Sequence, residues 1–221
     1  MYAPPQFKPD RSSCLAFAAA RGFGLACAHD AAGPIASPLP FAIQYASDGT
    51  PLLSFHIARN NPLARCADAR TPWLMAVTAG HAYVSADWYA SPDQVPTWLY
   101  RSVQLTGPAA VMSASELDAQ LDDVSAVFES ALAPKRPWTM AKMAAGRRNA
   151  MKQAIVGVMM RVDAVTGSFK LNQHKSDADH VAVAAALARQ PDAGSQEIAA
   201  EMVALRPHLD YTVPAFAGEP A

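Results

Sequence analysis

Residues 81–89 read His-Ala-Tyr-Val-Ser-Ala-Asp-Trp-Tyr, and residues 95–100 read Val-Pro-Thr-Trp-Leu-Tyr. We expect a short strand over residues 81–85, directly after Gly80, and a second strand that begins at Thr97. In the second stretch Trp98 and Tyr100 alternate with other residues, which is typical of a strand with two different faces. Polar and aromatic side chains are therefore concentrated where predicted strands begin and end.

Further predicted strands lie on both sides of this segment. Apolar runs bounded by turn residues predict strands over residues 23–29, 35–44, 52–57, 73–78, 97–112 and 155–165. Pro38 and Pro40 lie in the second of these runs and indicate an edge strand or a bulge, and Gly107-Pro108 predicts a break in the longest run. Turns are expected at residues 30–33, 47–49 and 166–168. Strands at this spacing, joined by tight turns, indicate an antiparallel barrel or sandwich.

Helices are predicted around these strands. One begins at Asp10 and stops at Gly22, and apolar residues at three- and four-residue steps predict another over residues 117–132. Further helices are expected over residues 140–152, 179–188 and 196–205. The sequence therefore predicts a mainly β fold with peripheral helices, as one domain over residues 1–213. Within it, residues 174–206 form a helical C-terminal extension, and residues 214–221 are expected to be a loose tail.

Composition narrows the class of protein. The chain has 221 residues, of which 51% are apolar and only 17% charged, with a formal net charge of −1. So few charges favour an oligomer that buries additional surface, and they argue against a nucleic-acid-binding surface, which needs clustered Lys and Arg. The short pairs Lys135-Arg136 and Arg147-Arg148 are interpreted as solvated helix faces.

The cysteines and the N-terminus indicate the compartment. An odd number of cysteines, three, without a CxxC motif, fits a reducing cytoplasm and no disulfide framework. The N-terminus does not resemble a signal peptide, and no apolar run approaches the roughly 20 residues that span a bilayer. We therefore expect a cytoplasmic, soluble protein with no membrane partner.

Several common active-site motifs are absent from the sequence. There is no GxGxxG after a strand, no Walker A loop, no HExxH and no GxSxG, so a dinucleotide fold, a nucleoside triphosphatase, a zinc protease of that type and an α/β-hydrolase are not supported. His174 and His180 are six residues apart and do not have metal-ligand spacing. No metal site and no catalytic residue are assigned.

Four clusters of polar and aromatic residues remain as a candidate site: residues 56–62, 80–89, 95–100 and 170–173. Each residue taken singly has a structural interpretation. Trp98 and Tyr100 can be core packing, His56 can be a buried histidine with a satisfied partner, and Asn60-Asn61-Pro62 can be turn chemistry. Only the combination of the four clusters favours a ligand site.

Taken together, the clusters resemble the PaiB family of FMN-binding negative transcriptional regulators, within the FMN-binding split-barrel superfamily. Residues 56–59 followed by Asn61-Pro62 are similar to its HLAR-x-NP motif, residues 81–89 to HAYVSPSWY, and residues 95–100 to VPTWNY. Residues 154–157 and 170–173 resemble the family's IVG and KLSQN elements, and Met1-Tyr2-Ala3-Pro4 with Phe7 resembles its opening. The resemblance covers residues 1 to about 188.

The resemblance implies an antiparallel split β-barrel of Greek-key type that forms a homodimer and holds FMN in a cleft between subunits. FMN needs donors for its phosphate, apolar or aromatic walls for its ring, and a few hydrogen bonds to the ring carbonyls. Arg59, Ser85, Thr97 and Lys170 suit the phosphate, Tyr83, Trp88, Tyr89 and Trp98 the ring, and Asn60, Asn61 and Gln173 the carbonyls. The full candidate set adds His56, Ala58, His81 and Tyr100.

Three departures from the family motifs bear on FMN occupancy. Pro38, Leu99 and His174 each stand where the family has a polar or amide side chain, and each lost hydrogen bond would cost about 1 kcal/mol. Three function classes are therefore expected: a flavin-binding regulator, an FMN-dependent oxidoreductase, or a scaffold that has lost its flavin. DNA as a partner rests on the family label alone.

Overall fold

The computed structural model describes residues 1–212 and contains one sheet with helices around it. The strands are β1 (Phe23–Asp30), β2 (Gly33–Pro40), β3 (Ala42–Tyr45), β4 (Pro51–Ala58), β5 (Asp68–Val84), β6 (Thr97–Val111), β7 (Ile155–Arg161) and β8 (Ala164–Lys170). The α-helices are α1 (Arg11–Arg21), α2 (Ala114–Ser130), α3 (Ala145–Gln153), α4 (Asp177–Ala188) and α5 (Ala193–Leu205). Short 3₁₀ turns are η1 (Pro5–Phe7), η2 (Pro62–Cys66), η3 (Ala86–Trp88) and η4 (Met140–Lys142).

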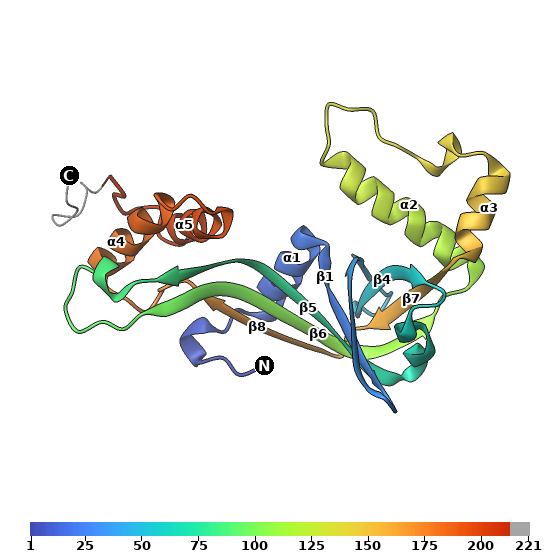
Figure 1. Ribbon diagram of the computed structural model, residues 1–221, viewed down its shortest axis with the longest axis horizontal. Helices are drawn as coiled ribbons and strands as arrows, with labels where there is room; N and C mark the ends of the chain where they lie inside the picture. The colour runs from blue at the N-terminus through green and yellow to red at the C-terminus, as the bar shows by residue number, and fades with distance from the viewer. Residues whose placement is uncertain (213–221) are drawn as a thin grey trace. The chain divides into compact units, whose positions relative to one another are not determined.

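The strand order in the sheet is β2-β1-β5-β6-β7-β4-β3, with β8 beside β6 (Figure 1). The pairings of β1 with β2 and β5, of β4 with β3 and β7, and of β6 with β7 are antiparallel. Pro38 lies in β2, which stands at one end of this order beside β1, and an edge strand tolerates a residue that has no N–H. The prediction of an edge strand from Pro38 and Pro40 is confirmed.

The chain divides into two compact units. Unit 1 contains Met1–Asp10, Thr78–Ser102 and the described residues from Gly167 onward, and unit 2 contains Arg11–Val77 and Val103–Thr166. The boundaries fall inside β5, β6 and β8, so each of these strands contributes residues to both units.

Unit 2 has a core built by alternation along its strands. In β4 the buried side chains include Leu53, Phe55 and Ile57, and in β5 they include Trp73 and Met75. The indole N–H of Trp73 donates to the Cys66 carbonyl at 3.0 Å, and the Trp73 ring lies 5.8 Å from that of Phe55. Strand β2, at one end of the strand order, also contacts β4, which is second from the other end. Contacts of this kind curl a sheet toward a barrel.

Unit 1 is a layer of strands with a helix pair on one side. Ala82, Val84, Leu99 and Leu171 form a buried cluster with Leu187, Ile198, Met202 and other apolar residues of α4 and α5. Figure 1 shows α4 and α5 on one side of this part of β5 and β6, and the N-terminal segment on the other side. The predicted C-terminal helices are confirmed, with both beginning two to three residues earlier than expected.

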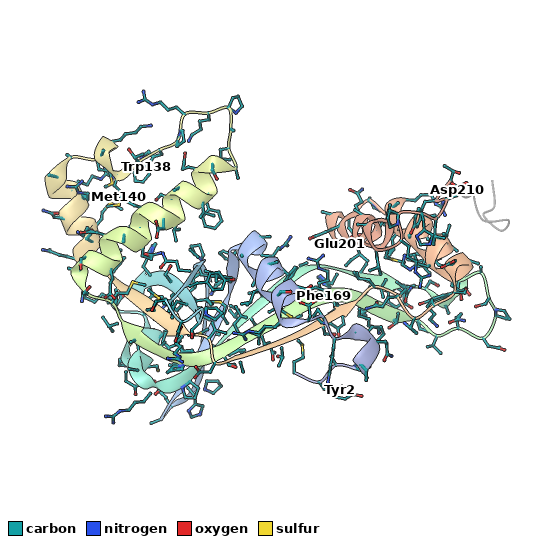
Figure 2. All side chains as sticks on the ribbon, turned by 180° about the vertical axis from the view of Figure 1, so that it is seen from behind. Tyr2, Trp138, Met140, Phe169, Glu201 and Asp210 are labelled. Carbon is teal, nitrogen blue, oxygen red and sulfur yellow. The ribbon has the colours of Figure 1, made fainter. Side chains whose placement is uncertain are left out.

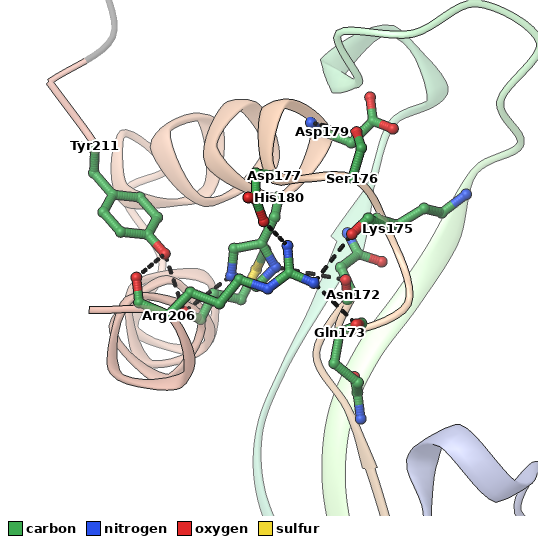
Figure 3. A network of polar contacts seen from close by, with 10 residues as sticks. Asn172, Gln173, Lys175, Ser176, Asp177, Asp179, His180, Arg206 and Tyr211 are labelled. Atoms are coloured by element: carbon green, nitrogen blue, oxygen red, sulfur yellow. Dashed lines mark hydrogen bonds and ion pairs between the residues drawn. The ribbon is translucent and has the colours of Figure 1, made fainter. Parts of the chain in front are cut away.

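Polar contacts fix the helix pair to the end of β8 (Figure 3). The guanidinium of Arg206 donates to the carbonyls of Gln173 and Lys175 at 3.0 and 3.1 Å and pairs with Asp177 at 2.6 Å. The fully buried His180 ring has its Nε2 2.9 Å from the Met202 carbonyl. The Met202 carbonyl lies in the last turn of α5, where carbonyls have no partner within the helix. The Gln173 and Lys175 carbonyls lie in the loop between β8 and α4. The network therefore ties this loop and α4 to α5 on the covered side of unit 1.

Two predicted strand breaks are wrong. Strand β5 runs through Gly80 without interruption, and β6 runs through Gly107. A Cβ at Gly107 would come within 1.8 Å of the Arg161 carbonyl, and a Cβ at Gly80 within 2.5 Å of the Glu197 carboxylate. Glycine marks a close approach at both positions, which a sequence cannot distinguish from a break.

Three further boundaries differ from expectation. The predicted strand 35–44 is divided at Phe41 into β2 and β3, and the predicted helix 140–152 is a 3₁₀ turn followed by α3. The turn predicted at residues 166–168 lies inside β8, because the chain turns earlier. There the N–H of Val162 donates to the Pro51 carbonyl and that of Asp163 to the Thr106 carbonyl, both at 2.9 Å. The predicted tail, residues 214–221, lies outside the described residues.

Candidate functional site

Strand alternation places five of the predicted site residues on one face of unit 1. Successive side chains of a strand point to opposite sides, and Ala82, Val84, Leu99 and Leu171 point toward α4 and α5. We call these four residues the covered face. Their sequence neighbours lie on the opposite side, and we call this set the open face: His81, Tyr83, Trp98, Tyr100 and Lys170.

Aromatic rings dominate the open face. The rings of His81 and Trp98 are stacked, with centroids 5.4 Å apart and 24° between planes, and Tyr83 meets Trp98 edge-on at 5.9 Å. Tyr83 and Trp98 are 48% and 51% exposed, which is high for large aromatic side chains on a β-sheet. This arrangement presents a flat aromatic surface to solvent.

A hollow of about 480 Å³ lies beside these rings. Three predicted residues, His81, Trp98 and Tyr100, line it. The sequence analysis missed its other lining residues: Met1, Thr78, Ala79, Arg101 and Ser102. No local motif could have found them, because the N-terminus and two strands meet here only in the folded unit.

Lys170 is the cation of the open face. Its ammonium donates to the hydroxyl of Thr97 and lies 5.9 Å from the centre of the buried Phe7 ring. The His174 ring meets the Phe7 ring edge-on, with centroids 5.2 Å apart. Burial lowers the pKa of His174, and the positive charges of Lys175 and Lys170 add to the effect. A Lys ammonium has three donors, so Lys170 keeps two for an anion.

Other predicted residues of unit 1 are engaged in structural contacts. Tyr89 is buried in the helix-side cluster and Trp88 packs against that cluster. Burial raises the pKa of the Tyr89 hydroxyl, although its hydrogen bond to Asn172 opposes the shift. The Ser85 hydroxyl accepts from the N–H of Asp87, and the Gln173 amide bonds to Gln6, Phe169 and Leu171 backbone groups.

The remaining predicted residues, His56, Ala58, Arg59, Asn60 and Asn61, belong to unit 2. His56 Nδ1 is 3.1 Å from the Gln120 amide oxygen. The Asn61 side chain caps η2 by accepting from Leu63 at 3.0 Å and donates to the Ser37 hydroxyl at 3.2 Å, so the turn interpretation describes it well. Ala58, Arg59 and Asn60 are exposed at the end of β4.

Arg59 is held by the backbone at the junction of α3 and β7. It donates to the carbonyls of Gln153 and Ile155 at 2.7 and 2.9 Å. Arg59 and Lys152 also line a hollow of about 440 Å³ at the N-terminus of α2. A phosphate contact of Arg59 stays a prediction.

The three departures from the family motifs have different surroundings. Leu99 is fully buried on the covered face, so an amide there would point away from the open face. Pro38 lies in an exposed position of β2 in unit 2, and the exposed His174 contacts Phe7. Leu99 therefore does not subtract a hydrogen bond from the open face.

Two kinds of feature, a metal-binding cluster and a membrane-spanning helix, are absent from residues 1–212. No group of three or more His, Cys, Asp or Glu side chains is arranged to hold a metal ion. No helix in this part of the chain is long and apolar enough to cross a membrane.

Comparisons with known proteins agree with the sequence motifs. The sequence model of a family described as "Putative FMN-binding domain" matches residues 1–164. The chain is 27% identical over 200 residues to the protease synthase and sporulation protein PAI 2 of Bacillus subtilis, covering 90% of this chain and 95% of that protein. The resemblance to the PaiB family is confirmed.

Solved structures show the fold. The FAD- and haem-binding protein of Mycobacterium smegmatis matches with a TM-score of 0.52 at 18% identity, covering 73% of this chain and 71% of the other. A conserved hypothetical protein of Mycobacterium tuberculosis matches with a TM-score of 0.51 at 15% identity, covering 76% and 90%. The expected fold, an antiparallel sheet with peripheral helices of the split-barrel type, is confirmed.

Proposed function

Because this chain belongs to that FMN-binding domain family, we propose that it binds FMN on the open face of unit 1. The observation that carries the proposal is that strand alternation gathers His81, Tyr83, Trp98, Tyr100 and Lys170 on one face, opposite the helix pair. Thr97 joins them through its hydrogen bond with Lys170.

The aromatic part of this face suits a flavin ring. Flat π-systems favour offset stacking and edge contacts with aromatic side chains, and the His81–Trp98 stack with Tyr83 at its edge offers both. The adjacent hollow of about 480 Å³ falls in the range of small-molecule sites, roughly 300–1,000 Å³. Bound FMN would supply redox chemistry, while these residues bind and orient it.

Lys170 and Thr97 suit the phosphate. The phosphate of FMN is an anion that is best bound by charge-assisted hydrogen bonds. The Lys170 ammonium of the open face donates to the hydroxyl of Thr97, the first residue of β6, so these two polar groups lie together. The residues present therefore fit the cofactor by charge, shape and polarity.

The test compares FMN with riboflavin, which lacks the phosphate. Lys170→Ala should weaken FMN at least ten-fold, since a charge-assisted contact contributes about 1.5–3 kcal/mol, and should change riboflavin affinity little. Both ligands are titrated by visible absorption and fluorescence quenching, with Lys8→Ala, an exposed lysine of the same unit, as the matched control. Unchanged FMN affinity, or an equal loss for both ligands, would contradict the phosphate assignment.

We further propose that the protein is a homodimer. Phe23 and Leu25 alternate on β1 of unit 2 with side chains 53% and 41% exposed, and the open face of unit 1 is also uncovered. Exposed apolar residues in such sets favour a protein interface. Sedimentation equilibrium should give twice 23.4 kDa, and Phe23→Asp should shift the mass toward that of one chain. An FMN-dependent oxidoreductase activity and a role as a DNA-binding regulator stay predictions.

A further inference from the structure

A second hollow lies within unit 2, among α2, the segment around η4, and α3. Its volume is about 230 Å³. Its lining residues are His56, Leu121, Ser125, Trp138, Met140, Met143, Arg148, Met151, Lys152 and Ile155. Figure 2 shows Trp138 and Met140 on the segment that links α2 to α3. Apart from His56, none of these residues belongs to the predicted flavin site.

The walls of this hollow are apolar and adaptable. Three methionines and one tryptophan contribute to them, and Met151 remains 54% exposed while Trp138 is 36% exposed. Methionine is flexible and polarisable and contacts aromatic rings favourably. Such walls suit a flat apolar group, and their exposure leaves apolar surface that a ligand would cover.

Arg148 supplies a positive charge in the lining of this hollow. Within the described part of the chain its guanidinium has no hydrogen bond or ion pair, whereas Lys152 nearby is paired with Asp118. Asp122 shares two neighbouring hollows with Arg148 but does not line this one. A planar guanidinium at the edge of an apolar hollow is suited to a carboxylate, which it binds through two parallel hydrogen bonds.

One polar residue of the lining, His56, is held by a hydrogen bond. The His56 ring lines the hollow, and the Nδ1–H of His56 donates to the amide oxygen of Gln120, which is 2% exposed. A buried partner of this kind holds the imidazole ring in one orientation. The lining therefore combines a histidine ring held by a buried partner, apolar side chains and one unpaired cation.

We propose that this hollow binds a small aromatic carboxylate, with its ring against Trp138 and the methionines and its carboxylate on Arg148. Its volume of about 230 Å³ exceeds the roughly 150 Å³ of an apolar cavity that holds benzene. It is below the roughly 300 Å³ at which sites for larger ligands begin, so it is too small for a flavin. The site is independent of FMN binding on the open face.

The test uses 3-phenylpropionate and its neutral amide, titrated by calorimetry and by tryptophan fluorescence. The acid should bind the full chain more tightly than the amide. Arg148→Met, which keeps an apolar side chain of similar length, should weaken the acid at least ten-fold and leave the amide unchanged. Arg147→Met is the matched control, because Arg147 is exposed and lines none of these hollows.

Three outcomes would overturn the proposal: equal affinity for acid and amide, no effect of Arg148→Met, or no binding of either probe at millimolar concentration. Trp138→Ala should weaken both probes, since both place a ring in the hollow. The same variants should keep their FMN affinity. Failure of the hollow and failure of the flavin proposal are thus separate results.

Discussion

Leu99 and Trp98 are neighbours in β6, yet Leu99 is fully buried among the C-terminal helices while Trp98 is half-exposed. The same contrast separates Ala82 and Val84 from His81 and Tyr83 in β5. The covered face stabilises unit 1 through burial, whereas the open face leaves aromatic surface in solvent at the cost of stability. This difference indicates that residues of the two faces should affect different measurements.

The largest expected effect is on the covered face. Leu99→Ala should lower the free energy of unfolding by about 2–5 kcal/mol, because it removes a fully buried side chain and leaves a cavity. Urea unfolding measures this loss, and Val95→Ala, at an exposed position of the same unit, should change stability by less than about 0.5 kcal/mol. If FMN affinity of the folded Leu99→Ala variant also fell ten-fold, the two faces would not be separate.

The polar network of the helix pair comes next. Arg206→Ala should cost about 1.5–3 kcal/mol, since it removes hydrogen bonds of a charged donor to the Gln173 and Lys175 carbonyls. Arg206→Lys keeps the charge but not the planar geometry of the guanidinium. The stability of this variant should therefore lie between that of the native protein and that of Arg206→Ala. A lysine variant as stable as the native protein would show that charge alone accounts for the contribution.

The open face should respond in binding rather than stability. Trp98→Ala should weaken FMN about ten-fold through lost ring contacts, a loss of about 1.4 kcal/mol, and should change unfolding little. Trp138→Ala, at an exposed tryptophan of unit 2, is the control and should bind FMN normally. Equal FMN affinities for native and Trp98→Ala protein would contradict the open face as the ring site.

The smallest effect concerns acid stability of the covered side. Burial raises the pKa of the Asp179 carboxyl, but hydrogen bonds from the Ser91 N–H and hydroxyl, at 2.8–2.9 Å, and from Ser176 outweigh it, so the net pKa is lowered. Asp179 therefore stabilises the fold above its unfolded pKa of about 3.9, and this contribution is lost as pH falls through the folded pKa. Ser91→Ala should flatten the acid limb of stability measured against pH.

Much of the fold follows from local patterns in the sequence. The apolar run over residues 52–57, bounded by turn residues, predicted β4, and the apolar steps through Leu117 and Val124 predicted α2. Both patterns are local, so they can be recognised without knowledge of the packing partner. Predictions that rested on single glycine residues were wrong. Glycines at positions 80 and 107 were interpreted as breaks, although they allow close approach of other segments.

For the candidate site, too, the sequence determined some features and the tertiary structure decided others. The sequence by itself determined the family, the strand period of residues 81–85 and 97–100, and thus which side chains share a face. Only the tertiary structure decided which of the two faces the helices cover, because a period of two is the same for both. It also decided that Tyr89, Trp88 and Leu99 pack with residues of α4 and α5, and that Arg148 and Trp138 share a hollow with His56, since these contacts join segments far apart in the chain.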